Sequence, residues 1–264
     1  MTIEFRCIRC GQLLRVSEQD EGKRARCPTC NAIVDIPGDD QPSTPVVLNR
    51  DKSDVIDYEL FGDENQYVEI TLDPGEITVA KAEHFLYMTP GIAMESAATD
   101  DSGGGLLERL SQVGRRMVSG SSLKMTAFCN VAEQREIVAF APTQAGRLFP
   151  LHLDEFDEQI FCQSQSILCL ARGIEISEVE VSSLDHVTTM QRIVGDGIAV
   201  LQCPGQLVHH ELKANKKLVV NSSSILAFTS GIQITKFEPH GVEESVPVST
   251  VVGPGEIWLC AGSF

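Results

Sequence analysis

Apolar and polar residues alternate along most of the chain after residue 58. Val68, Ile70 and Leu72 are apolar, whereas Glu69 and Thr71 between them are polar. Successive side chains of a strand point to opposite faces, so such alternation between Gly, Pro and Asn turns predicts β-strands. We therefore expect an all-β body over residues 58–264.

The body also contains an internal repeat. Residues 166–176 align without a gap on residues 224–234, and a weaker third copy spans residues 84–94. Single hairpins cannot bury their apolar faces alone, but stacked copies share an interior. The sequence therefore predicts three related β-units.

One glycine stands at the same position of each copy: Gly91, Gly173 and Gly231. Glycine adopts positive φ at no steric cost, which lets the chain turn sharply into the next strand. We expect a tight turn with positive φ at all three positions.

Residues 102–120 depart from the β-pattern. They begin with three glycines and continue with apolar residues at helical spacing, namely Leu106, Leu107, Leu110, Val113 and Met117. One short amphipathic helix is expected here, covering an open end of the β-structure. The alternative is a mobile lid or a partner-docking helix that carries Arg109, Arg115 and Arg116.

Four cysteines near the N-terminus form the most specific motif. Cys7 and Cys10 make one Cys-x₂-Cys pair, Cys27 and Cys30 make another, and 16 residues separate the pairs. This spacing predicts a tetrahedral structural Zn²⁺ site, whose binding would supply most of the folding free energy, on the order of 10 kcal/mol. Four thiolates leave the ion no open position for catalysis. A redox dithiol is the alternative, but its usual βαβ setting is not predicted.

These patterns divide the chain into three segments. Residues 1–36 form the zinc ribbon, and residues 58–264 form the body. Residues 37–57 are rich in Pro, Asp, Ser and Thr and have no sustained apolar period. They are expected to be a linker.

Charge separates the ribbon from the rest. The net charge is −16; residues 1–36 hold six Lys/Arg and five Asp/Glu, or +1, which leaves 15 − 32 = −17 for residues 37–264. Such an acidic body repels phosphate backbones, so nucleic acid is not expected as its partner. The ribbon's basic residues either contact nucleic acid or an acidic protein, or are simply solvated. They are Arg6, Arg9, Arg15, Lys23, Arg24 and Arg26.

The other candidate residues suggest no catalytic centre. Cys162 and Cys169 fall in repeat positions that apolar or small residues occupy elsewhere, which predicts small core side chains. Cys129, Cys203 and Cys260 have no neighbouring His or Asp motif. His209 and His210 are adjacent, so on a strand they face opposite sides and cannot chelate one ion.

The sequence also bears on localisation. Its nine cysteines are an odd number with only four in pairs, which favours a reducing cytoplasm over a disulfide framework. The apolar runs are far shorter than the roughly 20 residues of a membrane helix, so no transmembrane segment is expected. Charges within the first ten residues argue against a signal peptide.

Several motifs together resemble those of one family. They are the stretch 67–76, the following stretch 85–94, the glycine-rich entry at 103–107 and the paired Ser-Ile-Leu copies. In this order they resemble the altered-inheritance-of-mitochondria protein twenty-four family over about residues 58–264. The resemblance implies a fold like that of the tryptophan RNA-binding attenuation protein superfamily, a duplicated double-stranded β-helix or β-roll. It implies no catalytic residues, and mitochondrial members are associated with inner-membrane organisation and respiratory assembly.

The leading hypothesis is a non-catalytic cytoplasmic scaffold or adaptor. The zinc ribbon would dock one protein partner, and the β-roll would bind another protein or a further copy as a homo-oligomer. One alternative is nucleic-acid binding through the basic ribbon. The other is an enzyme or small-ligand binder with a pocket at the end of the β-roll, under the 102–120 helix.

Overall fold

The computed structural model describes the chain in separate stretches: residues 2–6, 13–17, 23–26, 28, 33–35, 53–96, 123–179, 181, 190–237 and 247–262. The chain divides into two compact units, an N-terminal unit, Met1–Arg50, and a second unit, Asp51–Phe264, for which we keep the word body. The described residues form strands and short 3-10 helices, which confirms the all-β fold class. The helix predicted at residues 102–120 lies outside the described residues.

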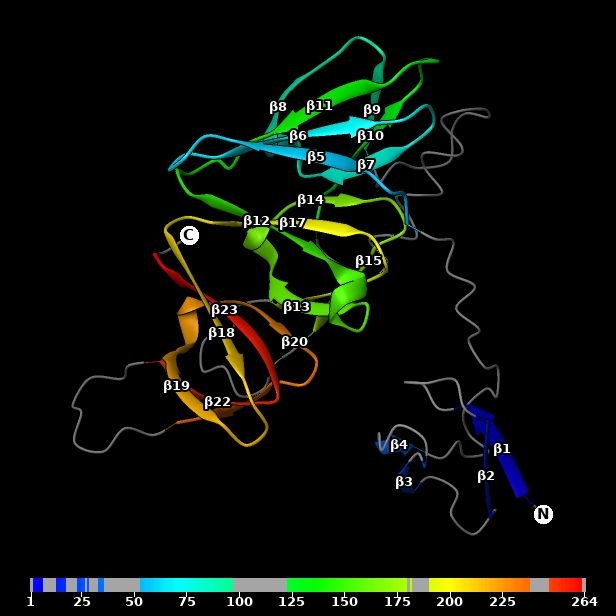
Figure 1. The fold of residues 1–264 in the computed structure, drawn as a ribbon, viewed down its shortest axis with the longest axis vertical. Helices are drawn as coiled ribbons and strands as arrows, with labels where there is room; N and C mark the ends of the chain where they lie inside the picture. The colour runs from blue at the N-terminus through cyan, green and yellow to red at the C-terminus, as the bar shows by residue number, and fades with distance from the viewer. Residues whose placement is uncertain are drawn as a thin grey trace. The chain divides into compact units, whose positions relative to one another are not determined.

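The N-terminal unit contains two antiparallel hairpins (Figure 1). β1 (Thr2–Arg6) pairs with β2 (Leu13–Ser17), and β3 (Arg24–Arg26) pairs with β4 (Ile33–Asp35). Hairpins of this size have too little apolar surface to fold alone. The unit therefore needs another source of stability.

The body begins with β5 (Asp57–Phe61) and continues with three sets of six strands, which we call repeats 1 to 3. Repeat 1 (residues 67–140) holds β6 (Tyr67–Leu72), β7 (Ile77–Ala80), β8 (Phe85–Met88), β9 (Ile92–Ser96), β10 (Thr126–Asn130) and β11 (Glu136–Phe140). Repeat 2 (residues 147–203) holds β12 (Arg147–His152), β13 (Gln159–Gln163), β14 (Ile167–Ala171), β15 (Glu175–Val179), β16 (Met190–Val194) and β17 (Ile198–Cys203). Repeat 3 (residues 206–261) holds β18 (Gln206–Leu212), β19 (Lys217–Asn221), β20 (Ile225–Thr229), β21 (Gln233–Lys236), β22 (Val248–Val252) and β23 (Gly255–Ala261).

The six strands pair in the same way within each repeat. The sixth strand pairs with the first and the third, and the fifth pairs with the second and the fourth. The third strand carries a register shift against the sixth in every repeat, and each shift passes over one leucine. These leucines are Leu86, Leu168 and Leu226. Shared pairing and a shared bulge show that the three sets follow one plan.

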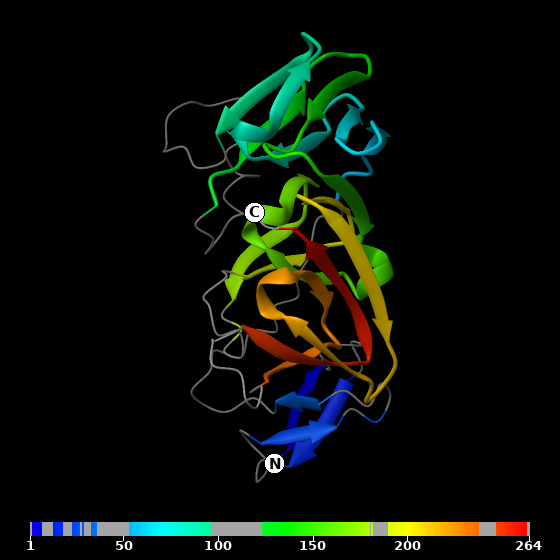
Figure 2. The same cartoon turned by 90° about the vertical axis from the view of Figure 1, so that its left-hand side faces the viewer.

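Two joints connect the repeats. β7 pairs antiparallel with β14, and β13 pairs antiparallel with β20, so in both cases the second strand of one repeat meets the third strand of the next. The joints produce two six-stranded sheets, β12-β17-β14-β7-β10-β9 and β15-β16-β13-β20-β23-β18. The outer sheets, β5-β6-β11-β8 and β19-β22-β21, lie at opposite ends of the body in both views (Figure 1, Figure 2).

The pattern of apolar residues explains where the core lies. On β6 the predicted alternation is observed, because Val68, Ile70 and Leu72 are fully buried and the residues between them are less so. β14 and β17 belong to a joined sheet and are buried along their whole length. Continuous apolar runs are expected of strands covered on both faces. The main core runs through all three repeats, and a second cluster fills the far end of repeat 3.

The three aligned glycines only partly follow the expected turn geometry. Gly173 has a φ of 95°, as predicted, but Gly91 and Gly231 are outside the positive-φ region. A Cβ on Gly231 would lie 2.3 Å from the carbonyl oxygen of Pro254, and one on Gly91 would lie 2.5 Å from Cδ of Glu136. The prediction of positive φ is therefore wrong at these two positions, where close approach of another segment requires glycine.

Residues 53–57, which the sequence analysis assigns to the linker, belong to the body. The Asp54 carboxylate accepts hydrogen bonds from Arg172 Nη2 at 2.7 Å and from the Ile77 backbone N–H at 2.9 Å. The backbone N–H of Arg172 donates to the Ile77 carbonyl at 3.1 Å. Asp54 thus bridges the two chain segments that meet at the first joint.

Candidate functional site

Each cysteine pair of the ribbon lies between the two strands of one hairpin. Cys7 and Cys10 follow β1 and precede β2, and Cys27 and Cys30 follow β3 and precede β4. The four cysteines lie outside the described residues, so their ligand geometry stays a prediction. Two hairpin turns that each carry a Cys-x₂-Cys pair suit four-thiolate zinc binding. Within the stretches that the structure describes, no group of three or more His, Cys, Asp or Glu residues could hold a metal.

Two basic residues of the ribbon stand opposite acidic residues in the strand registers. The register of β1 and β2 places Glu4 opposite Arg15, and that of β3 and β4 places Asp35 opposite Arg24. Arg26, the residue before Cys27, is exposed and stands opposite an apolar residue. The strand registers thus place an acidic residue opposite two of the six basic residues.

The cysteines of the body are in apolar surroundings. All five are buried and unbridged: Cys129, Cys162, Cys169, Cys203 and Cys260. Burial raises the pKa of Cys162 to about 12 and also raises the pKa of Cys169. A thiol that stays protonated at neutral pH is a poor nucleophile and a poor metal ligand. These environments agree with the predicted small core side chains.

One close pair of thiols was not anticipated from the sequence. Cys203 Sγ donates to Cys260 Sγ at 3.0 Å, although the residues are 57 positions apart. They come from the sixth strands of repeats 2 and 3. Burial and then the contact with Cys260 raise the pKa of Cys203 to about 12. No local signal predicts the pair, because it depends on how the two repeats pack.

Two of the histidines, His84 and His209, take up structural positions. His84 is buried, and neither ring nitrogen has a hydrogen-bond partner among the described residues. Burial and then the nearby Lys81 lower the pKa of His84, so its ring is neutral at pH 7. His209 is more exposed; its Nε2 lies 2.7 Å from Glu256 Oε2, and its ring stacks on Trp258 with centroids 5.0 Å apart. These partners fix a surface side chain and do not assemble a set of metal ligands.

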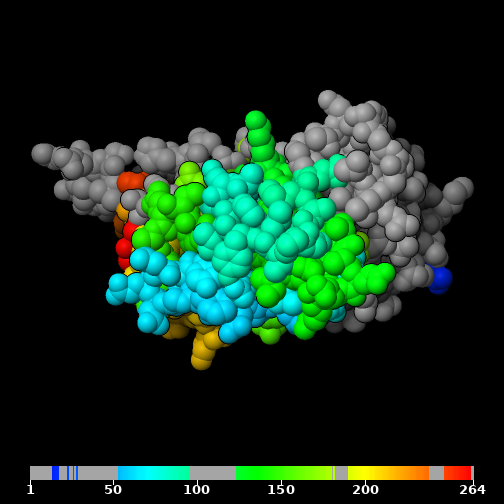
Figure 3. Space-filling view, turned by 90° about the horizontal axis from the view of Figure 1, so that it is seen from above, coloured from blue at the N-terminus to red at the C-terminus, as the bar shows by residue number. Residues whose placement is uncertain are grey.

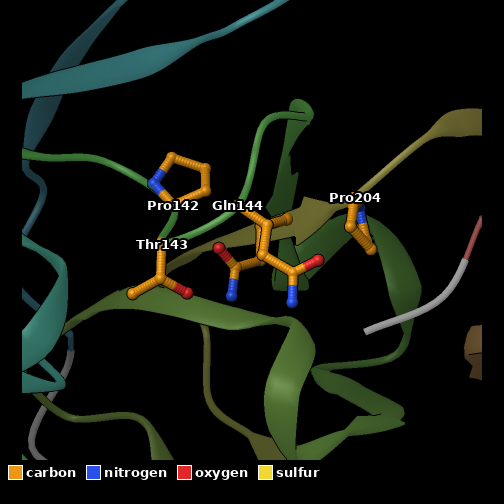
Figure 4. A pocket seen from close by; sticks show the side chains of 5 residues that line it. Pro142, Thr143, Gln144 and Pro204 are labelled. Carbon is orange, nitrogen blue, oxygen red and sulfur yellow. The ribbon is translucent and has the colours of Figure 1, made fainter.

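A small pocket lies where repeat 1 leads into repeat 2 (Figure 4). It is lined by Pro142, Thr143, Gln144, Gln202 and Pro204. Its volume of about 20 Å³ suits a single water molecule and is far below the roughly 300 Å³ of a small ligand site. Gln202 Oε1 is buried without a partner, while its Nε2 donates to the Gln165 carbonyl at 2.6 Å. A water bound to Gln202 fits this pocket.

The comparison with known families agrees with the architecture of the body. The sequence profile of the family described as Mitochondrial biogenesis AIM24 matches residues 58–261, which include all three repeats. The chain belongs to this family. The resemblance predicted from the motifs is confirmed, and the AIM24 region coincides with the body and leaves out the cysteine pairs of the ribbon.

A solved structure shares the AIM24 fold of this chain. Protein SPYM3_0169 from Streptococcus pyogenes, determined by X-ray crystallography, is 20% identical and has a TM-score of 0.60; the match covers 79% of this chain and 94% of that chain. At this identity the likeness concerns the fold alone. No curated protein matches the chain.

The family description names mitochondrial biogenesis, which is a process and not a chemical reaction. AIM24 membership therefore assigns no role to a particular residue. In the part of the chain that the structure describes, no helix has the length and apolar character needed to span a membrane.

Proposed function

We propose that the chain is a non-catalytic scaffold or adaptor, with a zinc ribbon that docks one protein partner and an acidic body that makes a second contact. The observation that carries this proposal is the position of each Cys-x₂-Cys pair between the strands of one hairpin. Zinc held by four thiolates stabilises a small fold and leaves no position for a substrate. The ribbon would then act through its surface.

The donor set fits zinc better than other metals. Cys7, Cys10, Cys27 and Cys30 offer four soft thiolate ligands, which favour zinc over magnesium or calcium. The hairpins formed by β1 to β4 are short, and a bound metal would supply the energy that so small a fold needs. Bound zinc would contribute structure only, because its coordination sphere is full.

The body supports a binding role through its surface. Its thiols are buried with raised pKa values, and the pocket of Figure 4 holds about one water. Residues 37–264 carry a net charge of 15 − 32 = −17, which favours partners with a basic surface. We place this binding in the cytoplasm, since nine cysteines without a paired framework suit a reducing compartment.

Native mass spectrometry combined with affinity capture tests the proposal. The intact chain should hold one zinc ion, and Cys27→Ser should lose both the zinc and the partner bound by the ribbon. Cys169→Ala is the matched control, because alanine occupies the aligned position 227 and the body should stay folded. Full zinc content in Cys27→Ser, or turnover of a metabolite by the purified chain, would contradict the proposal.

Nucleic-acid binding by the ribbon is the second candidate, supported by the exposed Arg26 beside Cys27. Retention of the full chain on a nucleic-acid column should fall steeply with salt if phosphates are bound. Arg24→Glu with Arg26→Glu should abolish retention, whereas Arg147→Glu in the body should leave it unchanged. Equal retention of all variants would exclude this function.

An enzyme or small-ligand binder is the remaining alternative. Its expected pocket lies under residues 102–120, outside the described residues, and the pocket of Figure 4 is too small for a metabolite. A retained metabolite or a second metal ion in native mass spectra would favour this alternative over the scaffold.

A further inference from the structure

The two joints between repeats are built in one register. Cys169 pairs with Ala80 at the first joint, and Ala227 pairs with Cys162 at the second. Residues 169 and 227 occupy the same position of the third strand, and residues 80 and 162 occupy the same position of the second strand. One rule therefore governs which strand meets which, and at what offset.

Two strands are left over by this rule. β8 is the third strand of repeat 1, and β19 is the second strand of repeat 3. Each ends a sheet, β5-β6-β11-β8 and β19-β22-β21, and no described strand covers its outer side. The fourth strands β9, β15 and β21 are sheet edges in every repeat, so a free outer side on these strands is the normal arrangement of the fold and indicates no missing partner. The first strands β12 and β18 are also sheet edges, although their counterpart β6 pairs with β5, which belongs to no repeat. Within the described structure, β8 and β19 are the strands that lack the cross-repeat partner their counterparts have.

Burial at equivalent positions shows what the missing partner would cover. Leu168 and Leu226 are fully buried at the two joints, but the equivalent Leu86 on β8 is 48% exposed. On the other side of the joint, Val79 is fully buried, whereas the equivalent Val219 on β19 is 49% exposed. Large apolar side chains exposed at a sheet edge mark a contact surface.

Backbone groups at both edges point outward in the matching places. The backbone groups of successive residues in an antiparallel strand point alternately toward and away from the neighbouring strand. The Thr89 N–H donates to the Ile137 carbonyl of β11, so the N–H and C=O of the preceding residue, Met88, point away from β11. The Ser222 N–H donates to the Pro247 carbonyl, so the N–H and C=O of Val219 point away from β22. Met88 and Val219 are the counterparts of Leu170 and Val79, which pair at the first joint.

The two edges cannot meet within one chain. β8 lies at one end of the body and β19 at the other in both cartoon views (Figure 1, Figure 2). Viewed from the β8 end, the surface is formed largely by residues in the cyan to green colours of β5 to β11 (Figure 3). A partner that completes the rule must bring its own copy of the opposite edge, and a second copy of this chain does so.

Charge also distinguishes the two edges. Residues 57–96 around β8 hold one basic and nine acidic residues, or 1 − 9 = −8. Residues 206–221 around β19 hold three lysines and one glutamate, or 3 − 1 = +2. Opposite charges favour contact between unlike edges and disfavour contact between two β8 edges.

We propose that β19 of one copy pairs antiparallel with β8 of the next copy, in the register of the inner joints. Met88 then lies opposite Val219, Tyr87 opposite Val220, and Thr89 opposite Leu218. Because the two surfaces differ, the contact is head to tail and continues until a ring closes or a filament forms. The inference rests on the proposed scaffold function for its use in the cell, and it names a second copy as the body's partner.

One feature of the inner joints is reduced at the free edge, which predicts a weak contact. Lys81 Nζ donates to the Ser164 carbonyl across the first joint, and Gln163 Nε2 donates to the Ile225 carbonyl across the second. Asn221 holds this position on β19; its side chain is shorter than those of Lys81 and Gln163, and its Oδ1 accepts from the backbone N–H of Ser223 in its own chain, which leaves Nδ2 as the donor for the contact. Association should therefore depend strongly on protein concentration.

Sedimentation velocity of the full chain tests the proposal, from about 1 μM to about 500 μM because small interfaces are weak. The mean mass should rise with concentration and fall with added salt. Val219→Pro removes an outward N–H and should leave a monomer at every concentration, since proline is tolerated on a sheet edge. Met94→Pro on β9 is the matched control, with a 43% exposed side chain and an outward N–H, and should assemble normally. A wild-type monomer throughout, or equal assembly of wild type and Val219→Pro, would overturn the proposal.

Cysteine cross-linking tests the register and the head-to-tail sense. A chain with Met88→Cys mixed with a chain carrying Val219→Cys should give a disulfide between peptides 88 and 219, identified by mass spectrometry, because hydrogen-bonded partners have Cα atoms about 5.5 Å apart. Neither variant alone should give a 88–88 or 219–219 link. Such symmetric links without the mixed one would contradict a head-to-tail contact.

The outcome is separable from that of the scaffold proposal. Cys27→Ser should abolish zinc binding and partner capture by the ribbon but leave self-assembly of the body unchanged. Assembly without ribbon-dependent capture would support this inference alone, and capture by a strictly monomeric chain would support the ribbon's role alone.

Discussion

The N-terminal unit and the body are both made of antiparallel strands, but we propose that they are stabilised in different ways. In the body, repeats 1 to 3 join through shared sheets and bury a continuous apolar core. The N-terminal unit has two short hairpins, with a Cys-x₂-Cys pair between the strands of each. A bound metal can stabilise a fold whose segments are too short to build a core. The comparison indicates that the two units should respond to different perturbations.

Metal removal should have the largest effect, and only on the N-terminal unit. A strong chelator should unfold the ribbon, because zinc binding is worth on the order of 10 kcal/mol to so small a fold. Limited proteolysis should then cut within residues 1–36 and leave the body intact. Cleavage of both units at the same chelator concentration would remove the distinction between them.

Truncation of a core side chain should have the opposite effect, destabilising the body and leaving the N-terminal unit unchanged. Phe128 is fully buried and packs against Phe85 and Phe140, with ring centroids 5.6 Å and 5.0 Å away. Phe128→Ala should lower the free energy of unfolding of the body by about 3 to 5 kcal/mol. Urea unfolding measures this, and the zinc content should not change. Val131→Ala, at a 47% exposed position, should stay within about 0.5 kcal/mol of wild type.

Loss of the Asp54 bridge at the first joint should have a smaller effect on the stability of the body. Asp54 is 8% exposed and binds both Arg172 and Ile77, so Asp54→Asn should cost about 1 to 2 kcal/mol. Asp57 instead pairs with Arg135 where both side chains are more than half exposed. Asp57→Asn should therefore change the urea midpoint very little. If both variants lost a similar amount of unfolding free energy, burial would not determine how much each ion pair contributes to stability.

The smallest expected effect concerns pH. Burial and Lys81 lower the pKa of His84 in the folded body, so the unfolded chain binds more protons once the pH falls below about 6.5. Stability of the body should consequently decrease as the pH drops through that value. Serine occupies the aligned positions 166 and 224, and His84→Ser should flatten the pH dependence of the urea midpoint. An unchanged slope would assign the acid sensitivity to other groups.

The strands and repeats of the body could be predicted from the sequence where they depend on residues that are close together in the chain. Alternation identified β6, and the aligned segments 84–94, 166–176 and 224–234 each contain the third strand of a repeat and the start of the fourth. Turn geometry was predicted correctly at Gly173 because it depends on the residue's own φ. At Gly231 it was not, because Pro254 from a distant strand pair sets the requirement.

Features that depend on distant pairing could not be predicted. The joints place Cys169 beside Ala80 and Cys162 beside Ala227, and no local pattern specifies which strands of different repeats meet. The contact of Cys203 with Cys260 arises in the same way. The ribbon differs, because its metal site is a prediction from spacing along the chain, and the four cysteines lie outside the described residues.

Counting reactive thiols tests the contrast between the two units most directly. A maleimide reagent at about pH 7.5 should label no cysteine rapidly in the native chain, since zinc protects four thiolates and burial protects five protonated thiols. A chelator alone should release four, at positions 7, 10, 27 and 30, and denaturant should then release the other five of the nine. Rapid labelling of the four ribbon cysteines without chelator, or of body cysteines in the folded chain, would contradict this account.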